Sequence, residues 1–187
     1  MEGKKKKAGI VCCSNGMKRS SEQMLIHLED TLMEIGIEPV FSNFIFEDGN
    51  VSSGTAQERA DALMDFYKDD EIKEIFDISG GDIANGVLPY LDYNVIKGTD
   101  KMFWGYSDLT TILNAIYTRT GKASVLYQIR NLIYDHRDRQ IEDFRDVTLD
   151  QGQSLFHFDY KFIQGKKMQG IVIGGNIRCF LKLAGTE

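Results

Sequence analysis

The spacing of apolar residues in the first half of the chain predicts alternating strands and helices. Short apolar runs at 8–13, 37–46 and 75–78 have the length and the β-branched content of buried strands. Between these runs, apolar side chains recur every three or four residues over 24–35 and 56–68, which is the period of an amphipathic helix. This alternation predicts a parallel sheet with helices on both faces.

Local signals mark the ends of the first two helices. Thr55 and Glu58 have the spacing of a capping box, in which each side chain satisfies a backbone N–H of the other residue. Gly36 suits the left-handed position that follows a helix. Ser20 or Ser21 can cap the first helix, and both alternatives remain open.

The pattern continues through a further pair of strands. Apolar runs at 102–106 and 122–127 predict strands, and the helical spacing over 108–118 predicts a helix between them. Ser107 is expected to cap that helix, since serine is a favoured N-cap residue. These repeated units predict a doubly wound α/β sheet, in which ligands bind at the carboxyl edge.

Beyond residue 128 the pattern becomes less regular. We expect a helix over 140–149, an extended segment or edge strand over 155–162, a strand over 170–173 and an apolar helix over 177–184. The predicted domain organisation is an N-terminal α/β domain at 1–130, a linker region at 131–164 and a partial C-terminal domain at 165–187.

Composition narrows the class of protein. A chain of 187 residues with 42% hydrophobic and 27% charged residues is typical of a globular protein. The net charge of −6 argues against a nucleic-acid partner. Since no apolar run approaches a membrane span, we expect no membrane partner and a cytoplasmic location. Cys12, Cys13 and Cys179 lack metal-ligand spacing and predict buried free thiols, so no metal or cofactor is expected.

The candidate chemistry lies in the turn at 79–82, which reads Ser-Gly-Gly-Asp and follows a predicted strand. Helical apolar spacing resumes at Val87, Leu88 and Leu91. A strand–turn–helix of this kind presents one side chain at its apex and directs backbone N–H groups toward it. The alternative is an ordinary connection in which glycine only supplies a positive φ.

Four segments resemble motifs of the LD-carboxypeptidase family, the serine peptidases that include the microcin-immunity peptidases. Residues 80–91 resemble the family's nucleophile turn, with Ala84 where the family has its serine. Residues 53–60, 103–110 and 170–176 resemble three further family motifs in the family's order.

This resemblance implies a flavodoxin-like or amidotransferase-like sandwich followed by the beginning of a smaller β-rich domain. It also implies hydrolysis of murein peptides or peptide–nucleotide antibiotics by a serine, glutamate and histidine triad. By position, Gly81 and Asn85 would supply the oxyanion donors. The remaining substrate-binding positions would be Gly80, Asp82, Ser107 and Asp108.

The chain departs from the family in two ways. Ala84 has no hydroxyl, and the sequence ends before the family's glutamate and histidine, while His27, His136 and His157 match no family position. We therefore expect a C-terminally truncated homologue that is inactive as it stands, binds a peptide or muropeptide and forms a homodimer. A non-catalytic module for anions or peptides, and a hydrolase that uses Ser107, are the alternatives.

Overall fold

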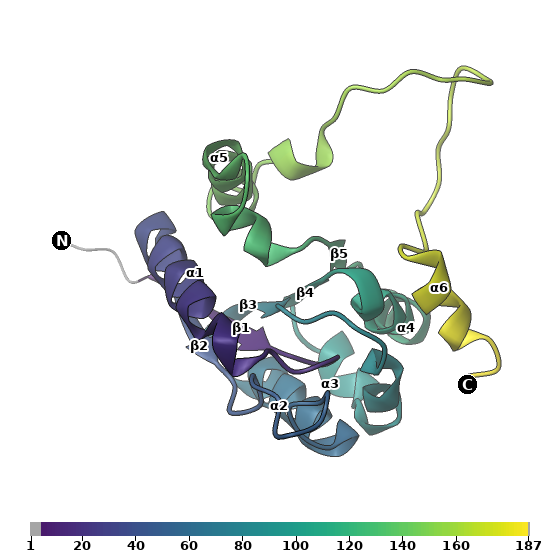
Figure 1. Cartoon of the computed structure of the whole chain (residues 1–187). Helices are drawn as coiled ribbons and strands as arrows, with labels where there is room; N and C mark the ends of the chain where they lie inside the picture. The colour runs from purple at the N-terminus through teal and green to yellow at the C-terminus, as the bar shows by residue number, and fades with distance from the viewer. Residues whose placement is uncertain (1–4, 187) are drawn as a thin grey trace.

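A parallel sheet organises the computed structural model, which describes residues 5–186 (Figure 1). Its five strands lie in the order β2-β1-β3-β4-β5, and every neighbouring pair is parallel. The strands are β1 (Lys6–Val11), β2 (Ile37–Phe41), β3 (Ile72–Asp77), β4 (Met102–Gly105) and β5 (Val125–Leu126). The strand order reverses beside β1, so the carboxyl ends of β1 and β3 flank the switch point where such sheets bind ligands.

Helices cover both faces of the sheet. The α-helices are α1 (Glu22–Ile35), α2 (Ala56–Lys68), α3 (Tyr93–Lys97), α4 (Thr110–Thr120), α5 (Arg137–Thr148) and α6 (Ile177–Phe180). Short 3-10 helices are η1 (Arg19–Ser21), η2 (Ala84–Tyr90), η3 (Ser107–Leu109), η4 (Ile129–Ile133), η5 (Ser154–Phe156) and η6 (Leu181–Leu183). One apolar core joins the sheet to α2, η2, α3 and α4, and the other joins it to α1, η4 and α5. The predicted α/β class is confirmed.

At the first two long helices, α1 and α2, two of the three predicted end signals are confirmed. Thr55 and Glu58 form both hydrogen bonds of the capping box at the start of α2. Gly36 closes α1 with a φ of 106°. Ser21 occupies the N-cap position of α1, but its side chain forms no capping hydrogen bond.

Close packing of α2 on the sheet depends on a glycine in β1. A Cβ atom added to Gly9 would lie 2.5 Å from Cδ2 of Phe66. The ring of Phe66 therefore occupies the space that any larger residue at position 9 would need.

Two predicted elements differ in the structure. The helix expected after the glycine turn is the 3-10 helix η2, which contains Pro89. Proline cannot donate a backbone hydrogen bond, and this disfavours a regular α-helix there. The strand expected at 170–173 does not form: Val172 is 90% exposed, and no strand pairs with this run in the part of the chain that the structure describes.

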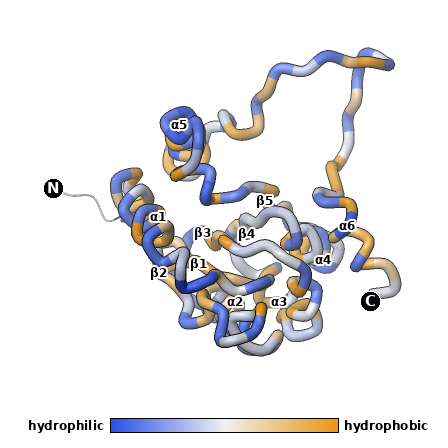
Figure 2. Tube along the Cα trace, in the orientation of Figure 1, coloured by the Kyte–Doolittle hydropathy of each residue, from blue (hydrophilic) through white to orange (hydrophobic). Residues whose placement is uncertain are grey.

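The segment between α5 and α6 extends away from the sheet (Figure 1) and includes hydrophobic positions along its trace (Figure 2). Among its residues, Phe158, Ile163 and Met168 are exposed. Residues 157–162 are extended but unpaired, so of the two alternatives for 155–162 the structure shows an extended segment that follows η5. The domain boundaries at 130 and 164 remain predictions. Within residues 5–186, no helix is both long and apolar enough to cross a membrane.

Candidate substrate-binding turn

Asp108 joins three parts of the carboxyl edge. Its side chain is fully buried, directly after β4. Its Oδ2 atom accepts a hydrogen bond of 2.6 Å from the Ser14 hydroxyl and one of 2.8 Å from the Ala84 backbone N–H. Because Ser14 follows β1 and Ala84 follows β3, one carboxylate fixes the chain after three neighbouring strands.

Asn15 braces the glycine turn. Gly81 has a φ of 137°, and a Cβ added to it would lie 2.1 Å from Oδ1 of Asn15. The same oxygen accepts a hydrogen bond of 3.1 Å from the Asp82 N–H. Gly81 is therefore required both by its backbone conformation and by the side chain packed against it.

A second buried carboxylate, Asp77, holds the start of the turn. It accepts hydrogen bonds from the Cys13 N–H at 2.8 Å, from the Ser79 N–H at 2.7 Å and from the Ser79 hydroxyl at 2.5 Å. Burial raises the pKa of Asp77 above its usual value, although these hydrogen bonds oppose the effect. The Ser79 oxygen also accepts a hydrogen bond of 2.9 Å from the Ser14 N–H, so the Ser79 hydroxyl both donates to and accepts from buried groups.

Arg59 links α2 to the residue before Ala84. Its side chain is 4% exposed, and its guanidinium donates to the carbonyl oxygens of Cys13, Gly54 and Ile83. Cys13 follows β1, Gly54 lies in the loop before α2, and Ile83 lies in the turn, so one guanidinium connects these three segments. Residue 59 lies within a family-like motif, but the sequence offered no sign of this linking role.

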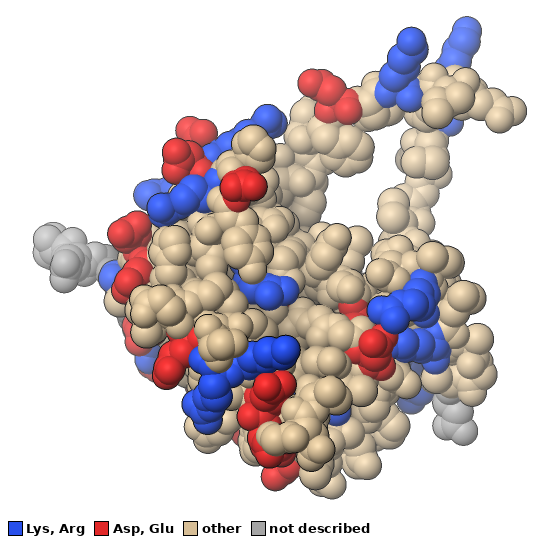
Figure 3. Space-filling model, viewed as in Figure 1, with Lys and Arg blue, Asp and Glu red and all other residues tan. Residues whose placement is uncertain are grey.

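Two cations from the C-terminal segment also reach the turn. Lys182 Nζ lies 2.6 Å from Asp108 Oδ1 and 2.8 Å from the Asp82 carbonyl oxygen, and Arg178 lies 2.8 Å from the Asp82 carboxylate. Burial raises the pKa of Asp108, but hydrogen bonds from Lys182, Ser14 and the Ala84 N–H outweigh burial and leave it below its usual value. Figure 3 shows acidic and basic side chains intermixed over the face that carries α6.

The structure brings the predicted site residues together but buries the central one. Ala84 is 0% exposed, and its methyl group belongs to the apolar core that includes Cys13 and Leu109. The expectation of a side chain presented at an exposed apex is therefore wrong. Its backbone N–H faces Asp108, whereas Asn85, the next residue, is exposed.

Ser107 does not cap α4, contrary to the prediction. It has a φ of 56°, a left-handed conformation that is uncommon outside glycine, and α4 begins three residues later at Thr110. A Cβ added to Gly80 would lie 4.0 Å from the Ser107 Cβ, so these two predicted residues are neighbours. Strained residues of this kind concentrate at functional sites.

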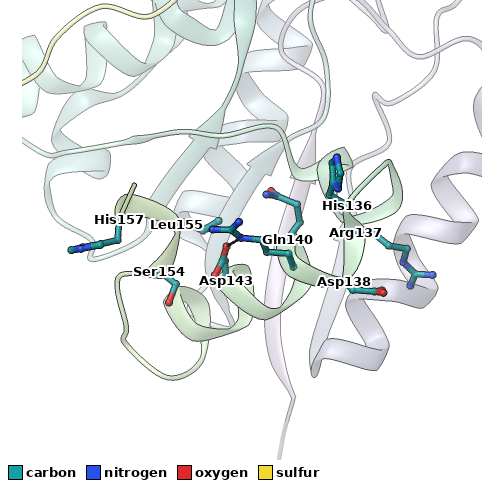
Figure 4. A pocket seen from close by; sticks show the side chains of 9 residues that line it. His136, Arg137, Asp138, Gln140, Asp143, Ser154, Leu155 and His157 are labelled. Atoms are coloured by element: carbon teal, nitrogen blue, oxygen red, sulfur yellow. Dashed lines mark ion pairs between the residues drawn. The ribbon is translucent and has the colours of Figure 1, made fainter. Parts of the chain in front are cut away.

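The described histidines are not at this turn. His27 is exposed on α1, and His136 and His157 line a separate surface pocket beside α5 and lie at its opposite ends (Figure 4). In that pocket the Ser154 hydroxyl donates to Asp146 at 2.5 Å rather than to a histidine. The pocket therefore has no serine–histidine pair poised for nucleophilic catalysis.

A pocket of about 710 Å³ opens beside Asn85. Its walls come from η2, α3, α4 and the C-terminal segment, and apolar residues such as Leu88, Phe180 and Leu183 dominate them. Asn85, Asn114 and Arg119 supply polar groups. This size and mixture are typical of a small-molecule site. Within residues 5–186, no group of three or more His, Cys, Asp or Glu side chains could hold a metal ion.

Comparison with known families agrees with this geometry. Residues 8–127 match the model of the LD-carboxypeptidase N-terminal domain. The chain belongs to the LD-carboxypeptidase family. The match begins within β1, extends through β5, and includes all the turn residues described above except those of the C-terminal segment.

Curated relatives are longer than this chain. The microcin self-immunity protein MccF of Escherichia coli is 27% identical over 166 residues, covering 72% of this chain and 48% of MccF. A Bacillus subtilis protein named "Probable murein peptide carboxypeptidase" is 25% identical over 166 residues, covering 83% of this chain and 50% of that protein. The chain thus spans about half the length of both relatives.

Solved structures show the same fold. A structure of MccF without ligand superposes with a TM-score of 0.76 at 21% identity, covering 98% of this chain and 64% of MccF. An MccF-like protein from Bacillus anthracis superposes with a TM-score of 0.69 at 29% identity, covering 77% of this chain and 44% of that protein.

Proposed function

We propose that this chain forms the substrate-binding N-terminal part of an LD-carboxypeptidase-like or microcin-immunity-like protein and does not hydrolyse its ligand as it stands. One observation carries the proposal: the turn is braced by Asp108 and Asn15, yet residue 84 is alanine. The scaffold is present and the attacking group is missing.

The chemistry explains the expected inactivity. Acyl transfer by a serine peptidase needs a hydroxyl and a base that removes its proton. Ala84 offers a methyl group, and the histidines of residues 5–186 lie elsewhere. Ser107 is close to the turn and is the alternative nucleophile, but among the described residues its hydroxyl has no hydrogen bond to a histidine or a carboxylate.

The ligand class follows from the pocket beside Asn85. Its apolar walls suit side chains of a peptide, and its amides and guanidinium suit peptide carbonyls or a carboxylate. A solved structure of MccF is in complex with glutamyl sulfamoyl guanosine. We therefore propose a muropeptide or a peptide–nucleotide as the ligand, a cytoplasmic location, a role in peptidoglycan recycling or microcin immunity, and assembly as a homodimer.

A simple anion is the second candidate for the same module. The N–H groups of the turn could hold a carboxylate or phosphate. However, Arg178 and Lys182 already pair with Asp82 and Asp108, so a free anion would compete with two carboxylates. The pocket therefore favours the peptide.

Hydrolysis and binding can be tested separately. The purified chain is incubated with murein tetrapeptide and with a peptidyl nucleotide, and products are followed by mass spectrometry. We expect no product, either for the chain or for Ala84→Ser, which gains a hydroxyl but no base. Turnover by the unmodified chain would contradict the proposed inactivity, and Ser107→Ala would then test the alternative nucleophile.

Binding is measured by calorimetry with the same ligands. We expect heat of binding that Leu88→Arg abolishes, because the long cation fills the apolar pocket. Ile26→Arg is the matched control, since Ile26 is exposed on α1 and is absent from the lining of that pocket. Absence of both heat and thermal shift with every ligand would refute the binding proposal.

A further inference from the structure

Residues 174–184, here called the strap, cross the carboxyl edge of the sheet. Gly174 exchanges two hydrogen bonds of 2.9 Å with the side-chain amide of Asn114, and the Asn176 N–H donates to the Thr110 hydroxyl at 3.0 Å. A Cβ added to Gly175 would lie 2.6 Å from Oγ1 of Thr110. The start of the strap is therefore hydrogen-bonded to the first turns of α4 and packs closely against Thr110.

The strap has one docked side and one open side. Cys179 on α6 is 0% exposed, whereas Ile177 and Leu181 are 70% and 64% exposed. The chain that leads to it is also exposed, since Phe158, Ile163 and Met168 are each at least 73% exposed. A segment with few buried apolar contacts can leave its site without unfolding the rest of the protein.

Lys182 links the strap by an ion pair to Asp108, in η3 at the carboxyl edge of the sheet. Its ammonium lies 2.6 Å from Asp108 Oδ1 and 3.6 Å from the Asp82 carboxylate. Among the described residues, Lys182 is the only cation within ion-pair distance of Asp108. Undocking would leave the buried Asp108 carboxylate without a countercharge, and an unpaired buried charge is strongly unfavourable.

We propose that the strap docks reversibly over the turn and that Lys182 is its latch. Asp108 connects the latch to the Ala84 N–H and to Ser14, so docking also supports the conformation of the turn. A ligand that approaches Asp82 or Asp108 from the strap's side must displace the strap. This inference concerns access to the turn and holds whether or not the pocket binds a peptide.

The three cysteines of the chain provide a direct assay. Cys179 belongs to the strap and lies on its docked, buried side, whereas Cys12 and Cys13 are buried after β1 and report unfolding of the sheet. The chain is treated with iodoacetamide under native conditions, and alkylation at each cysteine is timed by peptide mass spectrometry. For Lys182→Met we expect at least a ~10-fold faster reaction at Cys179, since a charge-assisted hydrogen bond stabilises docking by about that factor or more. Cys12 and Cys13 should keep their rates.

The matched control is Lys122→Met, which removes a similarly exposed lysine that pairs with Asp100 at 3.8 Å. It should leave all three rates unchanged. The direct electrostatic effect of the mutation works against the expected result: Lys182 lowers the pKa of Cys179, so its loss by itself would slow alkylation. An acceleration therefore reports exposure of the thiol.

A second experiment separates the effect of the Lys182 charge from the effect of its side-chain packing. In Lys182→Ala, added propylammonium should restore much of the protection of Cys179, whereas propanol should not. An unchanged Cys179 rate in Lys182→Met would overturn the latch, and so would equal rescue by the two additives. Parallel acceleration at Cys12, Cys13 and Cys179 would show global unfolding and would overturn independent docking. Failure of the calorimetric binding test would leave all of these outcomes unaffected.

Discussion

Residues 5–149 and residues 150–186 use similar apolar residues with opposite results. Phe144 on α5 is fully buried and packs against the rings of Phe76, Trp104 and Tyr127, with centroid distances of 5.5 to 5.9 Å. Phe158 is 73% exposed, and its recorded ring contact is with Tyr160, which is also exposed. An apolar pattern thus yields a buried element only where a second layer is available to cover it.

The largest expected effect separates these two phenylalanines. Phe144→Ala should lower the free energy of unfolding by about 3–5 kcal/mol, because it leaves a cavity among the three remaining aromatic rings. Phe158→Ala should change it by less than about 0.5 kcal/mol, as is usual for an exposed side chain. Urea denaturation followed by Trp104 fluorescence measures both. Equal losses would show that residues 150–186 are part of the same cooperative unit.

Two glycines with positive φ extend the comparison. Gly81→Ala should cost about 2 kcal/mol or more, because the new methyl group adds a clash with Asn15 to the backbone strain. Gly165→Ala has a similar backbone strain at its φ of 80° but meets no atom within 4 Å. Because it lies in the exposed segment, which can relax without disturbing the sheet, the free energy of unfolding should change by less than about 0.5 kcal/mol. Adding Asn15→Ala to Gly81→Ala should recover part of the loss. Without any recovery, the clash would not be the cause.

The contact between the two regions should depend on pH. The pKa of Asp108 is lowered in the folded chain, so its contribution is present above its unfolded value of about 3.9 and is lost as the pH falls through the lower folded value. The hydrogen-exchange protection of the Cys179 N–H should therefore be about 10-fold or more higher in the unmodified chain than in Lys182→Met at pH 7, and this difference should disappear at low pH. The measurement is the hydrogen-exchange protection of the Cys179 N–H, corrected for intrinsic exchange. A difference that stayed constant from pH 7 to acid would exclude Asp108 as the partner.

The smallest effects concern two helix caps. Thr55→Ala removes the capping box of α2 and should cost about 1 kcal/mol of unfolding free energy. Asn176→Ala removes the side-chain acceptor of the Cys179 N–H, at 3.3 Å, and should loosen the strap while the urea midpoint stays unchanged. Protection of the Cys179 N–H should fall by about five-fold, which corresponds to the typical cost of about 1 kcal/mol for a lost cap. A shift of the urea midpoint in Asn176→Ala would mean that the strap and the sheet unfold together.

The sequence could predict the features that depend on neighbouring residues along the chain. The capping box at Thr55, the left-handed glycine at position 36 and the alternation of strands and helices all follow from local periodicity and local hydrogen bonding. The family resemblance also located the turn and identified the alanine within it. The strand expected at 170–173 was wrong for a non-local reason, because an apolar segment forms a stable strand only where another strand pairs with it.

The site itself was less predictable. Gly80, Gly81, Asp82, Ala84, Asn85, Ser107 and Asp108 were all named from the sequence, and the fold gathers them at one edge of the sheet. The burial of Ala84 and the strained φ of Ser107 were not foreseen, because both depend on what packs around them. Ser14, Asn15, Arg178 and Lys182 were missed, since no local pattern distinguishes them from ordinary polar residues. Arg59 lies in the family-like motif at 53–60, but the motif does not indicate its linking role.

Local sequence patterns therefore predicted most of the helices and strands and the position of the turn, and the sequence itself shows that residue 84 has no hydroxyl. Only the tertiary structure decided which groups face that turn. Lys182 and Asp108 are 74 positions apart, and Asn15 and Asp82 are 67 apart, so neither pair has a signature in sequence spacing. Their contacts arise because parallel strands bring their carboxyl ends to one edge, where buried carboxylates and backbone N–H groups require partners wherever in the chain these occur.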